Sequence, residues 1–237
     1  MYLYETHLHT FPVSDCSIVS VEKIMEFYKL MNYDGIFITN HFIDDSFGGN
    51  QNMSYKERID FFFSDYEKGK KLSEEIGIKV FYGLEASYLG TDFLVYGLDK
   101  EWFLSHPEIE HMEKSKVLPY YMEYGALVVQ AHPFREAGYI DHIRLFPRCV
   151  QGIEVANASR TEFENEAALW YAKYYGLLEF AGTDNHGRLK THLAGMSCET
   201  PVTDEKDFVH KVLTGQMQLF TKKLEIPFKN TNLTTIS

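Results

Sequence analysis

The stretch MYLYETHLHT (residues 1–10) predicts a β-strand that begins almost at the first residue and ends in two histidines. A helix is expected over 20–31, because a serine suited to an N-cap precedes a periodic apolar face. The apolar run IFITN (36–40) then predicts a short buried strand that ends at His41. The first forty residues therefore indicate a strand–helix–strand unit with histidines at the strand ends.

The same alternation of strands and helices continues along the chain, and no low-complexity linker or block of charge divides it. This pattern favours a single α/β domain with a parallel sheet, and the length suits a (β/α) barrel. We expect one domain over 1–237, with the barrel at about 1–222 and a short polar C-terminal tail. Further helices are expected at Ser54–Ile76, Ser115–Tyr124, Glu162–Tyr175 and Thr203–Leu213, and further strands at Lys79–Tyr88, Phe93–Leu98, Leu127–Ala131, Gly152–Ala156, Leu178–Gly182 and Gln218–Lys222.

The composition excludes several classes of protein. Of the 237 residues, 45% are hydrophobic, which supports a sizeable core and excludes disorder over most of the length. A net charge of −11 disfavours stable binding along a nucleic-acid backbone. Three scattered cysteines without a CxxC pair form neither a disulfide framework nor a cysteine-rich zinc site. No signal-peptide pattern and no apolar run of about 18 residues is present, so we expect a cytoplasmic protein without a membrane partner.

Side chains that can bind metal ions fall at the C-terminal ends of the predicted strands. In His7-Leu8-His9 the alternation of a strand places both imidazoles on one face, and Asp184-Asn185-His186 has the same spacing. Strand ends of a barrel converge on one face, so these residues should meet although they are distant in sequence. Imidazole and carboxylate ligands suit Zn, Mn or Fe. The candidates are His7, His9, His41, Glu85, His132, Asp184 and His186.

Six segments carry a resemblance to a known family, and they occur in order as HLHT (7–10), VSD (13–15), ITNHF (38–42), GLEAS (83–87), AHPFR (131–135) and AGTDNH (181–186). This set resembles the PHP superfamily of metal-dependent phosphoesterases, which is named for polymerase and histidinol phosphatase. The resemblance extends from residue 3 to about residue 196. It implies a distorted seven-stranded (β/α) TIM-like barrel of the PHP type, with two or three divalent metal ions (Zn, Mn or Fe) at its C-terminal face.

The resemblance also implies further ligands. Asp15 follows the first two histidines, although the step from His9 is one residue longer than in many relatives, so a neighbour of Asp15 is an alternative ligand. Asp92 stands where many members have a histidine that begins a motif like HLLGY. Glu85 is expected to bridge two metal ions. The implied ligand set is His7, His9, Asp15, His41, Glu85, Asp92, His132, Asp184 and His186.

Metal ions of this kind lower the pKa of a bound water and polarise phosphoryl oxygens, so a metal-bridging hydroxide would attack phosphorus. Arg135 comes three residues after the strand-end histidine of its segment, and its planar fork suits phosphate oxygens. Arg160 and Arg188 also follow strand ends. We expect all three arginines to bind substrate, and we expect Glu85, Arg135 and Asp184 to be catalytic. Glu154 and Asn157 are expected to hydrogen-bond to the ligands.

The leading hypothesis is a metal-dependent phosphoric ester hydrolase, namely a phosphatase that acts on a small phosphate monoester. Selectivity is expected to lie in loops such as 42–54 and 99–115. A second hypothesis is a phosphodiesterase or nuclease that acts on nucleotides or short single-stranded ends. A third is a metal-binding regulatory domain without turnover. A fourth is a carbon–nitrogen hydrolase of the amidohydrolase kind, which predicts a carbamylated lysine near mid-chain, where no strand-end lysine occurs.

Overall fold

A computed structural model describes residues 1–44, 46–49, 52–188 and 191–224. Its strands are β1 (Tyr2–Leu8), β2 (Gly35–Ile38), β3 (Lys79–Tyr82), β4 (Leu84–Tyr88), β5 (Thr91–Tyr96), β6 (Leu127–Ala131), β7 (Gly152–Asn157), β8 (Leu178–Gly182), β9 (His192–Cys198) and β10 (Gln218–Lys223). Its helices are α1 (Val21–Leu30), α2 (Tyr55–Ile76), α3 (Lys100–Ser105), α4 (Lys114–Glu123), α5 (Glu162–Tyr175) and α6 (Glu205–Leu213), with a 3₁₀ turn at Pro107–His111. The expected C-terminal tail lies almost entirely outside the described residues.

The described strands form two sheets of five, in the orders β10-β9-β1-β2-β3 and β4-β5-β6-β7-β8. The mixed α/β class is therefore as expected, but the described residues do not show the predicted distorted seven-stranded (β/α) barrel, because their ten strands are divided between two sheets. The expectation of a parallel sheet holds for β1-β2-β3 and for β6-β7-β8. It fails for β4-β5-β6 and for β9 and β10, which pair antiparallel.

The chain changes sheet at Gly83, so the single strand predicted over 79–88 is wrong. Residues before this glycine form β3 in the first sheet, and residues after it form β4 in the second. A Cβ atom at Gly83 would lie 2.8 Å from the ring of Tyr96 and 3.1 Å from Thr39 Cγ2, so only glycine lets the chain pass here. Both flanking segments are apolar, and for this reason the sequence pattern alone did not separate them.

The antiparallel part of the second sheet begins with a tight hairpin between β4 and β5. The turn consists of Leu89 and Gly90, which have φ angles of 49° and 79°. Positive φ at both central residues is the geometry that matches the twist of a two-residue hairpin. Strand β5 of this hairpin also pairs with β6, where Asp92 lies opposite Ala131. This pairing brings Asp92 beside the C-terminal end of β6.

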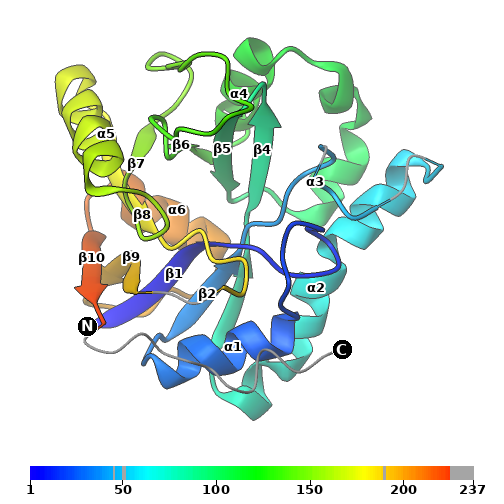
Figure 1. Ribbon diagram of the computed structural model, residues 1–237. Helices are drawn as coiled ribbons and strands as arrows, with labels where there is room; N and C mark the ends of the chain where they lie inside the picture. Colours follow the sequence, from blue (N-terminus) through cyan, green and yellow to red (C-terminus); the bar gives the residue numbers. More distant parts are fainter. Residues whose placement is uncertain (45, 50–51, 189–190, 225–237) are drawn as a thin grey trace.

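The two longest helices begin and end where the sequence predicted. Ser54 with Glu57 forms a capping box at the start of α2, and Thr161 with Glu164 forms one at the start of α5. Each helix ends at a glycine with positive φ. In Figure 1, α1 and α2 lie together along the first sheet, and α5 stands beside β7 and β8 of the second.

Two elements were missed by the sequence analysis, namely the short helix α3 and the strand β9. The sequence of β9, HLAGMSC, contains glycine, serine and alanine, which have weak strand propensity. It becomes a strand because it is paired on both sides, with β1 and with β10. Its residues are buried except for His192 at its start.

The two sheets meet where β1 and β2 end. His41 forms a bridge with Glu85 of β4, and Leu8 forms a bridge with Asn185, which follows β8. The backbone N–H of Phe42 donates to the carbonyl of Glu85 at 2.9 Å, and that of His9 donates to Asn185 at 2.9 Å. Residues from both sheets therefore surround one region. None of the described helices is long and apolar enough to span a lipid bilayer.

Candidate metal centre

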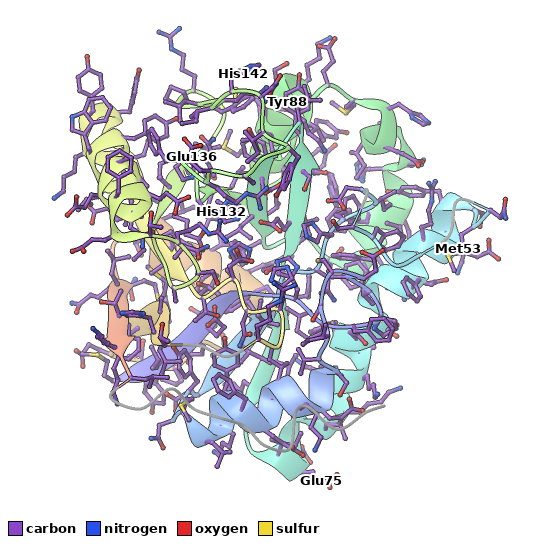
Figure 2. The ribbon with its side chains drawn as sticks, in the orientation of Figure 1. Met53, Glu75, Tyr88, His132, Glu136 and His142 are labelled. Carbon is purple, nitrogen blue, oxygen red and sulfur yellow. The ribbon has the colours of Figure 1, made fainter. Side chains whose placement is uncertain are left out.

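The structure brings most of the predicted ligands together in one buried cluster. Figure 2 shows His132 near the middle of the molecule, whereas His142 of the loop that follows lies at its upper edge. The members that gather there come from the ends of strands in both sheets. They are His7, His9, His41, Glu85, His132, Asp184 and His186.

Within the described part of the chain, three groups of side chains have ligand atoms that lie within 4.8 Å of one another. Neighbouring groups share a histidine, so the cluster is continuous. Each group combines residues from both sheets. The groups are His9 with His41 and His186, His7 with Glu85 and His132, and His7 with His9 and Asp184.

The carboxylate of Glu85 faces two of these groups at once. Its Oε1 lies 3.1 Å from His7 Nε2 and 3.4 Å from His132 Nε2. Its Oε2 lies 3.3 Å from His9 Nε2 and 3.5 Å from His41 Nδ1. A carboxylate with one oxygen toward each group has the geometry needed to bridge two cations, which is the role that the sequence resemblance implied.

A buried carboxylate behind the cluster orients its histidines. Glu154 Oε1 lies 2.9 Å from His7 Nδ1, and this contact leaves Nε2 of that ring facing the centre. Glu154 Oε2 accepts a hydrogen bond from the backbone N–H of His132 at 3.1 Å and from Asn157 Nδ2 at 2.9 Å. Metal-binding histidines commonly hold a carboxylate on their second nitrogen, which fixes the ring. The hydrogen-bonding role expected for Glu154 and Asn157 agrees with these contacts.

Glu5 was missed by the sequence analysis, although it ties the two sheets together. Its Oε1 accepts backbone N–H groups from His7 at 2.8 Å and from Thr183 at 2.9 Å. Burial raises the pKa of its carboxyl to about 7, although the hydrogen bonds from these N–H groups oppose the rise. The alternation Tyr4-Glu5-Thr6-His7 was the available signal, since it places a carboxylate on the same face as the first histidine.

The charges of the cluster strongly perturb one another. Burial by itself would raise the pKa of Glu85, but the adjacent His7 holds it well below its ordinary value. The pKa of Asp184 is also lowered against burial, mainly by His7 and His186. Burial and the charge of His186 lower the pKa of His9. Perturbations of this size mark functional sites, because structural cores seldom gather so many buried ionisable groups.

These residues fit divalent metal ions. Glu85 Oε1 and His132 Nε2 point into the cluster, and both atoms are buried without a hydrogen-bond partner of proper geometry. A buried polar atom left in this way is costly unless something binds it. Imidazole nitrogens with carboxylate oxygens are a donor set suited to Zn, Mn or Fe.

Two of the candidate ligands have unusual backbone conformations. His132 directly follows β6 and has a φ of 26°, and Asp184 follows β8 and has a φ of 52°. Residues other than glycine rarely adopt positive φ, and such residues collect at functional sites. The backbone is therefore held away from its preferred conformation at the positions where the side chains enter the cluster.

The structure places Cys16 rather than Asp15 beside the cluster. The side chain of Asp15 is exposed to solvent. The thiol of Cys16 is hydrogen-bonded to the rings of His41 and His186. Burial alone would raise the pKa of this thiol, but the two imidazoles lower it to about 7. Cys16 is thus the neighbour that the longer step after His9 allowed as an alternative.

Asp92 lies at the margin of the cluster and is paired with an arginine. Its Oδ2 is 2.9 Å from Arg135 Nη2 and 4.0 Å from His132 Nε2. The hydroxyl of Ser87 donates to its other oxygen at 2.6 Å. Burial and the charge of Glu85 raise the pKa of its carboxyl. Asp92 is outside the three groups described above.

The three arginines that the sequence singled out line one cleft. This cleft has a volume of about 450 Å³, and Asp184 and His186 also contribute to its wall. A second cleft of about 660 Å³ adjoins the other side of Arg135 and is lined by His41 and Asp92 among others. Arg160 is half-buried and Arg188 is exposed. The structure therefore brings Arg135, Arg160 and Arg188 together next to the cluster.

Comparisons with known proteins identify the fold. No family model matches the chain, and no curated protein matches its sequence. Several solved structures do match. One is a two-domain protein of Bacteroides vulgatus that contains a predicted PHP-like metal-dependent phosphoesterase, with a TM-score of 0.68 and 14% identity. That alignment covers 92% of this chain, which spans 64% of the larger protein.

Other structures agree with this match. A protein of Bifidobacterium adolescentis, described as a metal-dependent phosphoesterase, aligns with a TM-score of 0.58 and 14% identity over 89% of this chain and 95% of its own. An amidohydrolase of Chromobacterium violaceum, solved with bound sulfate and no metal, aligns at 0.53 and 14% identity over 77% of this chain and 87% of its own. The chain therefore has the fold of the PHP-like metal-dependent phosphoesterases, as the ordered sequence motifs predicted. Within that fold, this chain has a cluster of histidines and carboxylates beside a cleft lined by three arginines.

Proposed function

We propose that the protein is a metal-dependent phosphatase that hydrolyses a small phosphate monoester. The observation that carries the proposal is the cleft shared by Arg135, Arg160 and Arg188 with Asp184 and His186. Three guanidinium groups at one cleft favour an anion with several oxygens, because each planar fork can donate two parallel hydrogen bonds to such a group.

The size of the cleft favours a small substrate. A volume of about 450 Å³ is in the range of ordinary small-molecule sites, and it is open enough for a phosphorylated metabolite. The net charge of −11 opposes extended contact with a polyanion, so a short or single phosphorylated molecule is the expected partner. Stable binding of nucleic acid is not part of the proposal.

The proposed cofactors are divalent metal ions held by the histidine and carboxylate groups. When bound, such ions polarise a phosphoryl group and lower the pKa of water. Glu85 would bind one ion with each of its oxygens. Glu154 would keep the Nε2 atom of His7 directed at the centre. The arginines would fix the phosphate with its leaving group toward the open cleft. Catalysis of phosphoryl transfer depends mainly on such positioning and charge stabilisation.

The test compares substrate classes on the same metal-loaded protein. Protein reconstituted with Mn or Zn is assayed on p-nitrophenyl phosphate, on bis-p-nitrophenyl phosphate and on a p-nitroanilide. The proposal expects turnover of the monoester well above that of the other two, with competitive inhibition by inorganic phosphate. Preference for the diester would instead support the phosphodiesterase hypothesis. The anilide arm is included because one similar structure is described as an amidohydrolase, and preference for it would refute phosphoester chemistry.

The control is a variant that changes the cleft but leaves the histidine and carboxylate groups in place. Arg160 lines the cleft and is outside the three groups. Arg160→Met should raise KM for the monoester and weaken inhibition by phosphate, while metal content stays the same. An unchanged KM and an unchanged inhibition constant would remove Arg160 from the substrate site.

A further inference from the structure

We propose that the guanidinium of Arg135 occupies the position of a third cation, so that this centre binds two metal ions and not three. The inference rests on the metal centre of the proposed function and concerns its composition. Two features support it, namely the ring nitrogens that the histidines leave available for ions and the ion pair between Asp92 and Arg135.

The three ligand groups do not allow three ions at once. One ring nitrogen binds one ion, and His7 belongs to two of the groups, as does His9. His7 Nδ1 is engaged with Glu154 at 2.9 Å, and His9 Nδ1 lies 3.3 Å from Ser14 Oγ. Each of these rings therefore offers only its Nε2 atom to the centre.

The two groups that share no residue can be filled together. They are His9 with His41 and His186, and His7 with Glu85 and His132. Glu85 presents a separate oxygen to each of them. Asp184 Oδ1 lies 3.6 Å from both His7 Nε2 and His9 Nε2, so this carboxylate lies between the two groups. These side chains would hold two ions, with the carboxylates of Glu85 and Asp184 between them.

Of the ligand positions that the resemblance implied, Asp92 is the one that lies buried beside the cluster but outside the three groups, and it is already paired with a cation. Its side chain is 2% exposed, and its Oδ2 lies 2.9 Å from Arg135 Nη2 in an ion pair that lacks hydrogen-bond geometry. Arginine stays protonated at any ordinary pH, and the charges of Asp92, Glu85 and Asp184 raise its pKa further, against burial. A divalent ion at Asp92 would have to displace this guanidinium or to lie against a like charge.

Arg135 is held in this position from several sides. Its backbone N–H donates to the carbonyl of His132 at 2.9 Å, which closes a tight turn after β6. Its guanidinium carbon lies 5.7 Å from the centre of the Tyr139 ring. The side chain is 18% exposed, and it lines both clefts. Its guanidinium can therefore neutralise Asp92 through Nη2 and still line the clefts that a substrate anion would enter.

The test is metal stoichiometry, which does not depend on turnover. Wild type, Arg135→Met, Arg135→Lys and Arg160→Met are saturated with Mn, freed of excess ion, and analysed for Mn per chain. Wild type, Arg135→Lys and Arg160→Met are expected to hold two ions, because each keeps a cation beside Asp92. Arg135→Met is expected to hold three. The third ion should give an anomalous scattering peak at Asp92 in crystals of this variant.

Three ions in the wild type, or two in Arg135→Met, would overturn the inference. If Arg135→Met does not fold, crystals of the wild type soaked in Mn decide the matter, since a peak in coordination with Asp92 would refute the inference and two peaks remote from it would support it. Fewer than two ions in the wild type would refute the metal centre itself. Two ions in all four proteins would refute only the role of Arg135 and leave the proposed function intact.

Discussion

Replacing Glu85 by glutamine tests the centre at its most connected residue. The substitution keeps the shape of the side chain, but it removes one negative charge and turns one oxygen into an NH2 group that cannot bind a cation. Four imidazole nitrogens lie within 3.5 Å of this carboxylate, two on each of its oxygens. Glu85→Gln therefore removes a ligand from one group. It also removes the negative charge that would offset the repulsion between two ions.

The expected loss follows from that geometry. If both ions contribute to stabilising the transition state, loss of the bridge should lower kcat/KM on a phosphate monoester by about 10³-fold, which corresponds to roughly 4 kcal/mol. One of the ions should also be retained less tightly. Folding should be preserved, because the centre is already crowded with charge and the variant is isosteric. Circular dichroism, Mn content and kcat/KM are measured on the same preparation.

Glu154→Gln is the matched control, because Glu154 is an equally buried carboxylate that contacts His7 without facing the groups. Loss of such an orienting contact typically costs 10–100-fold in metal affinity or activity. Excess Mn should therefore restore most of the activity of Glu154→Gln and little of that of Glu85→Gln. Full metal content with near wild-type turnover in Glu85→Gln would refute the bridging role.

Three further predictions concern the margin of the centre. At matched metal occupancy, Arg135→Ala should lower kcat/KM on a monoester by about 10²-fold, or roughly 2.7 kcal/mol, and Arg135→Lys should recover only part of the loss; equal values in all three proteins would contradict a phosphate-binding role. In metal-free protein at pH 8, where a thiol with a pKa of about 7 is mostly ionised, Cys16 should react with iodoacetamide before Cys198, whose thiol pKa is raised by burial, and metal loading should protect it; peptide mass spectrometry reads the order. Gly182→Ala would place a Cβ atom 2.5 Å from His7 Cβ, so Tm should fall by about 2–10 °C for a cost of roughly 1–3 kcal/mol, and an unchanged Tm would show that the strand ends yield easily.

The positions of the ligand candidates could be predicted because they depend on local rules. His7 and His9 alternate on a strand, and His132 and Asp184 directly follow buried apolar runs, so the strand-end position of each was readable from the sequence. Strand ends converge in many α/β arrangements. The prediction that these side chains meet therefore did not depend on the correct order of strands in the sheets. The difference between the expected barrel and the two observed sheets therefore did not displace the site.

The features that were not predicted depend on contacts between distant segments. The break at Gly83 follows from the nearness of the Tyr96 ring, which no local pattern reveals. Whether Asp15 or Cys16 faces the cluster is decided by the path of a loop, since adjacent residues in a loop have no fixed alternation. The pairing of Asp92 with Arg135 follows from the antiparallel register between β5 and β6.

The division of the ligands between the two sheets has a consequence for folding. His7 lies in β1 of the first sheet, and His9 and His41 follow strands of that sheet. Glu85 lies in β4 of the second sheet, and His132, Asp184 and His186 follow strands of the second sheet. Neither sheet alone supplies a complete group, so a chain with only one sheet formed has no site to occupy. The free energy of ion binding would then be available only to the fully assembled chain, and it would become free energy of folding. Removal of the ions should thus lower the free energy of unfolding and make the chain more sensitive to proteases.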